Sequence, residues 1–257
     1  NLSDPCKTTT EVTTTTTTTE VTTEEEVEVV DVKKGRSLPL ECVGQSHVAR
    51  SSFLTLGNFT SMRDEDMAEI LAGHDLSDEH MNAGQALLKE KFGHRIAGFQ
   101  HTAVSAAPNC IDHYGGGDFI QVLHVGGSHW VLVSNIECAE GQVCVYDSLN
   151  RKISSEVAAA ICRMVGGMAD NIKVNMPESQ YQDFSNDCGL FTLAYAYTLC
   201  EGFSPRFVGY DQGQMREHLF NCLRNREMTR FPPPTVGTEV EYLRATSFFI
   251  KNTVKPQ

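Results

Sequence analysis

The sequence predicts an α+β domain, with strands and helices alternating between about residues 61 and 224. Short runs of β-branched and aromatic residues between turn signals predict the strands. Longer stretches with apolar residues at helical spacing predict the helices, and Ser or Asp residues stand where several of these helices should begin.

Two helices are expected first. Ser61 with Asp64 three residues later is typical of a capping box and predicts a helix that runs to about Ala72. Ser77 predicts the start of a second helix. Its inward-facing side chains are expected to be Met81, Leu87, Leu88 and Phe92.

The remaining core elements follow in order. Strands are predicted at about residues 119–124, 129–136, 142–146 and 171–176. Ser154 or Ser155 should cap a helix, an uncharged stretch from Gly189 to Leu199 predicts a buried helix, and a last helix is expected at about residues 212–224. Val240 to Tyr242 is strand-like, but the sequence indicates no place for it in the fold.

The length of 257 residues indicates one domain with tails. Residues 1–38 are rich in Thr and Glu and should form a disordered tail, because they hold too few apolar residues to form a core. Residues 39–232 are expected to form the folded domain, and residues 233–257 a C-terminal extension of unknown role.

Charge and cysteine content exclude several classes of protein. A net charge of -12 argues against general nucleic-acid binding, which requires a basic surface. Nine cysteines without metal-ligand spacing indicate free thiols in a reducing, nuclear or cytoplasmic compartment, and neither a disulfide framework nor a zinc site. No stretch is long and apolar enough to predict a membrane span.

Three residue types in the middle of the chain suit nucleophilic catalysis. His129 opens an apolar run and Asp147 closes an alternating one, so both should lie at strand ends, while Cys188 begins the buried helix. A thiol becomes a good nucleophile when an imidazole takes its proton and a third group orients the imidazole. The unpaired N–H groups at a helix N-terminus also favour a thiolate. We therefore predict Cys188 as nucleophile, His129 as base and Asp147 as the orienting group.

Gln182 is a candidate for stabilising a developing oxyanion. It lies six residues before Cys188. A glutamine side chain and the backbone N–H of the nucleophile can together supply two donors to a carbonyl under attack.

The ordered set His129-Trp130, Asp147-Ser148, Gln182 and Asp187-Cys188-Gly189 resembles the signature of the ubiquitin-like-protein-specific (sentrin/SUMO) cysteine proteases. The segment from Leu76 to Asn82 resembles an early part of that family, although Asp75 stands where the family has Trp. Tyr210 to Leu219 and Phe231-Pro232 are similar to transposon-associated animal members. The resemblance covers roughly residues 50 to 232.

The resemblance implies the ubiquitin-like-protease/adenain type of fold, with a central mixed sheet flanked by helices. It implies cleavage after the Gly-Gly tail of a SUMO-like modifier, with the modifier or its conjugates as partner. Separately, we expect no cofactor, no metal, no membrane and a monomer. Trp130 would cover a narrow tunnel for the tail, and Asp78 would contact the modifier.

Other functions use the same residues. A protease of a viral or transposon polyprotein would share the whole catalytic set. A catalytically silent module that binds ubiquitin-like proteins is a further alternative. An acetyltransferase would also pass its acyl group through the cysteine, but no basic cluster suited to coenzyme A is evident.

Two minor motifs have both a functional and a structural interpretation. Val27, Val29 and Val30 lie between carboxylates and resemble a modifier-interacting motif, which binds as an added strand, or else form a chance cluster in the tail. The group His74, Asp75, Asp78 and His80 contains metal-ligand types. It surrounds a predicted helix start, where polar residues serve as caps, so we expect no metal.

Overall fold

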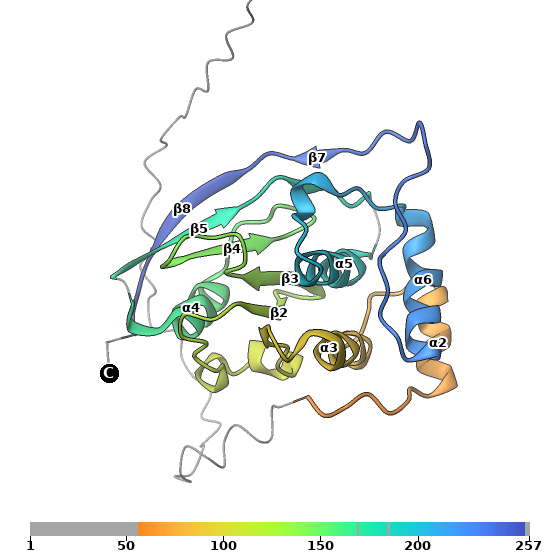
Figure 1. The fold of residues 1–257 in the computed structure, drawn as a ribbon, viewed down its shortest axis with the longest axis horizontal. Coiled ribbons are helices and arrows are strands. Elements are labelled where there is room, and N and C mark those ends of the chain that lie inside the picture. The colour runs from red at the N-terminus through yellow and green to blue at the C-terminus, as the bar shows by residue number, and fades with distance from the viewer. Residues whose placement is uncertain (1–55, 169, 184–185, 255–257) are drawn as a thin grey trace, which may run out of the picture.

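The computed structural model describes residues 56–168, 170–183 and 186–254. They form an α+β fold in which helices cover both faces of a six-stranded sheet (Figure 1). The predicted disordered tail (residues 1–38) and the motif at Val27, Val29 and Val30 lie outside the described residues.

The large sheet is mixed, as expected. Its strand order is β1-β2-β3-β4-β5-β8. The pairs β1/β2 and β4/β5 are parallel, and the other neighbours are antiparallel. Its strands are β1 (Ala97–Gly98), β2 (Phe119–Val125), β3 (His129–Ser134), β4 (Gln142–Tyr146), β5 (Asn171–Met176) and β8 (Thr246–Lys251). A second, two-stranded sheet pairs β6 (Ser179–Gln180) with β7 (Tyr242–Leu243).

The α-helices lie close to their predicted positions. They are α2 (Asp64–Leu71), α3 (Asp78–Phe92), α4 (Ser155–Val165), α5 (Cys188–Cys200) and α6 (Gln212–Asn225). Short 3-10 helices are η1 (Thr102–Ser105), η2 (Pro108–Cys110), η3 (Gly166–Met168) and η4 (Pro205–Phe207).

Alternation along the strands divides the core into two layers. Trp130 and Leu132 on β3 belong to the layer that also contains residues of α3 and α5. Val131 and Val133, the alternate residues of the same strand, belong to the layer formed with α4. Because successive side chains of a strand point to opposite faces, one short apolar strand contributes to both layers.

Helix α5 is buried along its whole length. Every residue from Cys188 to Cys200 is buried, which confirms the prediction made from the uncharged stretch. A helix that is hydrophobic all round belongs inside a protein. The first residue of this helix, Cys188, is consequently held by its packing.

The two predicted N-caps differ in outcome. Ser77 caps α3 as predicted, and its capping box is completed by the His80 side chain. The prediction of a capping box at Ser61 is wrong, because α2 begins after Arg63 and has no side-chain cap. Arg63 instead pairs with Asp66, with 2.8 Å between Nη2 and Oδ1. Acidic residues in the first turn of α2 interact favourably with the unpaired N–H groups.

The chain after residue 232 has a place in the fold that its sequence did not indicate. It passes Gly209, forms β7 and then runs along the sheet to β8, as the upper edge of Figure 1 shows. All six residues of β8 pair with β5. The position of the boundary at residue 232 stays a prediction.

Among the described residues, no helix is long and apolar enough to span a membrane.

Candidate active site

His129 and Asp147 meet at one end of the sheet. His129 is the first residue of β3, and Asp147 directly follows the last residue of the neighbouring antiparallel strand β4. The start of one antiparallel strand lies beside the end of the next. The distance from His129 Nε2 to Asp147 Oδ1 is 2.7 Å, and both side chains are almost fully buried.

The environment of His129 favours its protonated form. Burial lowers the pKa of the imidazole, but hydrogen bonds to Asp147 and Cys188, together with their charges, outweigh burial and raise the pKa to about 9. Since Nε2 bonds to Asp147, Nδ1 is the ring nitrogen left for the thiol. An imidazolium between a carboxylate and a thiol is the arrangement that stabilises a thiolate.

The Cys188 thiol lies at the start of α5, against the turn that leads into β3. Its Sγ is 3.6 Å from the carbonyl oxygen of Ser128, the residue before His129. Cys188 is 5% exposed. The structure therefore brings together His129, Asp147 and Cys188, which are far apart in the sequence.

Gly189 allows the beginning of α5 to pack closely against α3. A Cβ at this position would lie 2.9 Å from Met81 Sδ and 3.0 Å from Leu76 Cδ1. A larger residue would push the helix away from its neighbours. The glycine after the cysteine thus has a packing role, and it helps to fix the position of Cys188.

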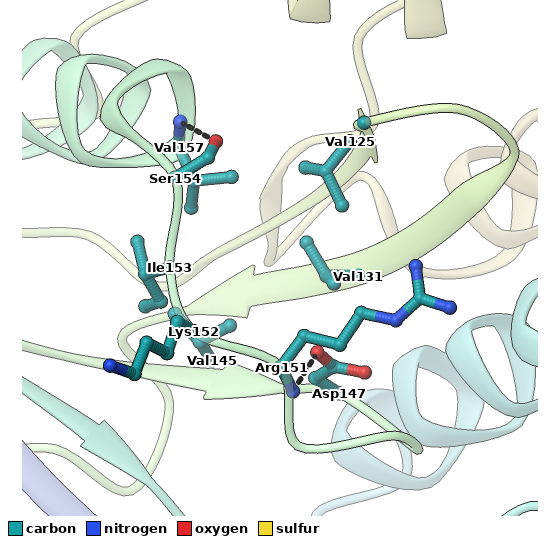
Figure 2. Close-up of a pocket in the computed structure, with 10 residues that line it drawn as sticks. Val125, Val131, Val145, Asp147, Arg151, Lys152, Ile153, Ser154 and Val157 are labelled. Carbon is teal, nitrogen blue, oxygen red and sulfur yellow. Dashed lines mark hydrogen bonds between the residues drawn. The ribbon is translucent and has the colours of Figure 1, made fainter.

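The loop after β4 holds the Asp147 carboxylate in place. Oδ1 accepts a hydrogen bond from the backbone N–H of Leu149 (2.8 Å), and Oδ2 accepts one from the N–H of Arg151 (2.9 Å). The latter bond is drawn in Figure 2. These backbone donors fix the orientation of the carboxylate that bonds to His129.

Asp147 lines one side of a small cavity. Figure 2 shows its aliphatic wall, with the Arg151 and Lys152 side chains beside it. Val125 and His129 are paired across β2 and β3, so they share a face of the sheet, and Val125 lines the cavity. The volume is about 120 Å³, which is smaller than the roughly 300–1,000 Å³ of typical small-molecule sites. The cavity has room for about one aliphatic side chain.

Gln182 is fixed to the residue after Asp147. The Ser148 hydroxyl donates to Gln182 Oε1 at 2.6 Å, and the Gln182 backbone N–H donates to the Ser148 carbonyl at 3.1 Å. With its oxygen used in this way, the amide NH2 of Gln182 is the end that can donate. Gln182 is 3% exposed, so its orientation is set inside the protein.

Trp130 and Asp78 occupy different environments. Trp130 is 2% exposed, and its Nε1 donates to the carbonyl oxygen of Leu76 at 2.9 Å. Its ring lies 4.5 Å from that of His124, between centroids. Asp78 is exposed at the start of α3 and accepts a bond from Thr102 Oγ1 at 2.6 Å. Whether either contacts a substrate stays a prediction.

Arg216 is a functional candidate that the sequence did not reveal. Its guanidinium pairs with Asp187, the residue before Cys188, with 2.5 Å between Nη2 and Oδ1. It also donates to the carbonyl oxygens of Ile70 and His74 (both 2.9 Å) and Asn186 (3.1 Å). The helix α6 is thereby tied to the chain leading into the nucleophile.

The group of His74, Asp75, Asp78 and His80 is not a metal site in this arrangement. His80 takes part in the α3 cap, and its Nε2 is 2.7 Å from the carbonyl oxygen of Asp66. Throughout the described part of the chain, no group of three or more His, Cys, Asp or Glu residues is placed to hold a metal ion.

Comparison with solved structures finds proteins of similar fold. The chain is similar to the SUMO protease Ulp1 with its catalytic cysteine oxidised to a sulfonic acid (13% identity, TM-score 0.48, covering 67% of this chain and 88% of that one). It is also similar to the C-terminal Ulp1 protease domain in complex with Smt3, the yeast ortholog of SUMO (10%, 0.44, 66% and 98%). A third is the catalytic domain of the Ulp1-like SUMO protease of Chaetomium thermophilum (13%, 0.47, 68% and 95%).

No protein-family model matches the chain, and no curated protein matches it.

Proposed function

We propose that this chain is a cysteine peptidase that cleaves after the C-terminal Gly-Gly of a ubiquitin-like modifier, with a SUMO-like protein as the modifier. The observation that carries the proposal is the contact of His129 with Asp147 on one side and Cys188 on the other, in a buried site at a helix start. The sequence resemblance described above supports the choice of substrate.

The first half of the reaction forms a thioester. The Cys188 thiolate attacks the carbonyl carbon of the terminal glycine, and negative charge develops on the carbonyl oxygen. The Cys188 N–H and the amide of Gln182 stabilise this oxyanion. His129 then gives its proton to the departing amine as the C–N bond breaks.

The second half returns the enzyme to its starting state. His129, now neutral, takes a proton from water, and the resulting hydroxide attacks the thioester carbonyl. The C–S bond breaks, which releases the modifier with a free carboxylate and restores Cys188. Asp147 keeps the imidazole oriented in both halves.

In the proposed reaction, the C-terminal tail of the modifier must reach Cys188. Trp130 would lie over an extended tail, and the segment from Leu76 to Asp78 would border it. The hydrogen bond from Trp130 to the Leu76 carbonyl supports this placement, because it joins the two segments. A cover of this kind would admit a Gly-Gly tail and exclude bulkier chains.

The experiment is a hydrolysis assay with a panel of ubiquitin-like proteins, each carrying a fluorogenic amide at its C-terminal glycine. We expect release of the fluorophore from a SUMO-like member, and no release by Cys188→Ala or His129→Ala. The Cys222→Ala variant is the matched control, since Cys222 also has an imidazole nearby, with 3.4 Å between Sγ and His218 Nε2. It should keep the activity.

The same assay separates the alternatives. Hydrolysis of unstructured peptides without hydrolysis of any modifier would favour a polyprotein protease. Binding of a modifier that survives Cys188→Ala, without hydrolysis by the unmodified chain, would indicate a silent binding module. Either result would overturn the proposed function.

A further inference from the structure

Two cysteines outside the candidate active site lie side by side. Cys138 is in the turn between β3 and β4, and Cys144 is in β4 itself. Their sulfur atoms are 2.8 Å apart. Among the described cysteines, no other two thiols are joined by a hydrogen bond.

Backbone hydrogen bonds and strand pairing hold the chain around Cys138 and Cys144 in place. The Cys138 N–H donates to the Asn135 carbonyl at 3.0 Å, and the Gln142 N–H donates to the Ala139 carbonyl at 3.0 Å. Cys144 is paired with Ser134 across β3 and β4. A disulfide bond is about 2.05 Å long, so the two sulfur atoms need to approach by less than about 1 Å to form one.

The two thiols differ in acidity, which favours the formation of a disulfide bond between them. The hydrogen bond between the two thiols lowers the pKa of Cys144, although burial opposes the effect. The same bond, together with burial, raises the pKa of Cys138. Ionisation is therefore favoured at Cys144 over Cys138.

Access to the pair is limited to small molecules. Cys138 is half-buried and Cys144 is 6% exposed. Cys162 and Cys200, with 2% and 0% exposure, form no hydrogen bond to another described cysteine and provide an internal comparison. A peroxide can reach such a pair, whereas a protein oxidant would be excluded.

We propose that Cys138 and Cys144 form a reversible disulfide, and that hydrogen peroxide or an alkyl hydroperoxide is the oxidant. The Cys144 thiolate attacks a peroxide oxygen, which breaks the O–O bond and gives a sulfenic acid and, after protonation, one water or alcohol. The Cys138 thiol then attacks the sulfenic sulfur, forms the S–S bond and releases a second water. The two thiols lose two electrons, and one peroxide gains them. A dithiol reverses the change.

The pair is independent of the proposed reaction. Asp147, which follows β4, lies three positions after Cys144 in the sequence, and Cys138 and Cys144 lie toward the opposite end of the β3–β4 hairpin from His129. A disulfide here closes a loop between residues six apart, so it should raise resistance to unfolding without rearranging the site.

The test uses the full chain with Cys188→Ala, which removes the nucleophile as a competing target. The protein is treated with increasing hydrogen peroxide, its remaining thiols are alkylated, and its peptides are mapped by mass. We expect the peptide containing Cys138 and Cys144 to lose two hydrogens at doses that leave Cys162 and Cys200 alkylated. Dithiothreitol should restore both thiols, and the oxidised chain should unfold at a higher urea concentration.

Two further variants complete the experiment. Cys138→Ser and Cys144→Ser should each abolish the loss of two hydrogens, and circular dichroism checks that they fold. Sulfinic or sulfonic acid at either position, or alkylation of both at doses that oxidise Cys162 or Cys200, would overturn the proposal. Because the first arm uses neither serine variant, a variant that fails to fold leaves the test intact.

Discussion

Arg216, which is partly buried, and the buried Asp187 form an ion pair directly beside the candidate nucleophile, with 2.5 Å between Nη2 and Oδ1. The second carboxylate oxygen of Asp187 accepts from Gln212 Nε2 at 2.8 Å. Arg216 and Gln212 both belong to α6, so this helix helps to fix the residue that precedes Cys188. The pair explains why Asp187 is not a conventional N-cap, since its side chain makes no bond to the first turn of α5.

Removal of Arg216 should destabilise the protein. Arg216→Met leaves a carboxylate with 7% side-chain exposure without its main cation, at a cost of about 3 kcal/mol in the free energy of unfolding. Urea denaturation measures this cost. Arg224→Met, at an exposed position of the same helix, should change stability by less than about 0.5 kcal/mol.

A double variant tests the origin of that cost. If the loss comes from the unpaired charge, Arg216→Met with Asp187→Asn should be less destabilised than the sum of the two single variants. Additive losses would mean that Arg216 acts mainly through the carbonyls of Ile70, His74 and Asn186.

Substitution of Gly189 should displace the start of α5. Gly189→Ala places a methyl group 2.9 Å from Met81 Sδ, and we expect a loss of about 1–3 kcal/mol in stability together with reduced activity. The matched control is Gly213→Ala in α6, where the nearest atom to the new Cβ is 3.4 Å away. That change should be neutral or stabilising by up to about 1 kcal/mol, because alanine favours helix. Equal losses in both variants would contradict the packing role of Gly189.

Ser148 should affect catalysis through Gln182. Ser148→Ala removes the bond to Gln182 Oε1, so the amide is less well oriented, and kcat should fall about threefold to tenfold with little change in KM. Gln182→Ala removes the proposed oxyanion donor and should lower kcat by about 10²–10³. Steady-state kinetics measure both. A larger effect on KM than on kcat would indicate a role in binding the substrate instead.

The stability of the protein should depend on pH through His129. Its folded-state pKa of about 9 lies above the value of 6.5 for an unperturbed histidine. The protonated imidazole therefore contributes stability that is fully present below pH 6.5 and is lost as the pH rises to about 9, by about 3 kcal/mol in total. Urea denaturation of the unmodified chain and of His129→Gln should show a difference in stability that shrinks between pH 6.5 and 9. A constant difference would contradict the raised pKa.

Local patterns in the sequence were sufficient to predict most of the helices and strands that form the core. Alternating apolar residues predicted β4 and β5 with their observed bounds, and the uncharged stretch predicted the buried helix α5. These signals are local, because a strand or a buried helix is recognisable from its own residues. The placement of His129, Asp147 and Cys188 at element ends followed from the same patterns.

Contacts between distant segments could not be predicted in this way. The pairing of β8 with β5, the reach of Arg216 to the His74 carbonyl and the bond from Trp130 to the Leu76 carbonyl all depend on how the elements pack. The Ser61 cap failed for a related reason, since the ion pair of Arg63 with Asp66 lies at the actual helix start. A capping motif indicates that a helix start is possible, and tertiary context decides where it forms.

The most direct measurement is the mass of the intact protein after incubation with ubiquitin-like proteins that carry an electrophile at the C-terminal glycine. The account predicts one covalent adduct, with a SUMO-like protein, which is located on Cys188 by peptide mapping and is lost in Cys188→Ala and His129→Ala but kept in Cys222→Ala. Folded protein that forms no adduct with any member of the panel, or an adduct located on Cys222, would contradict it.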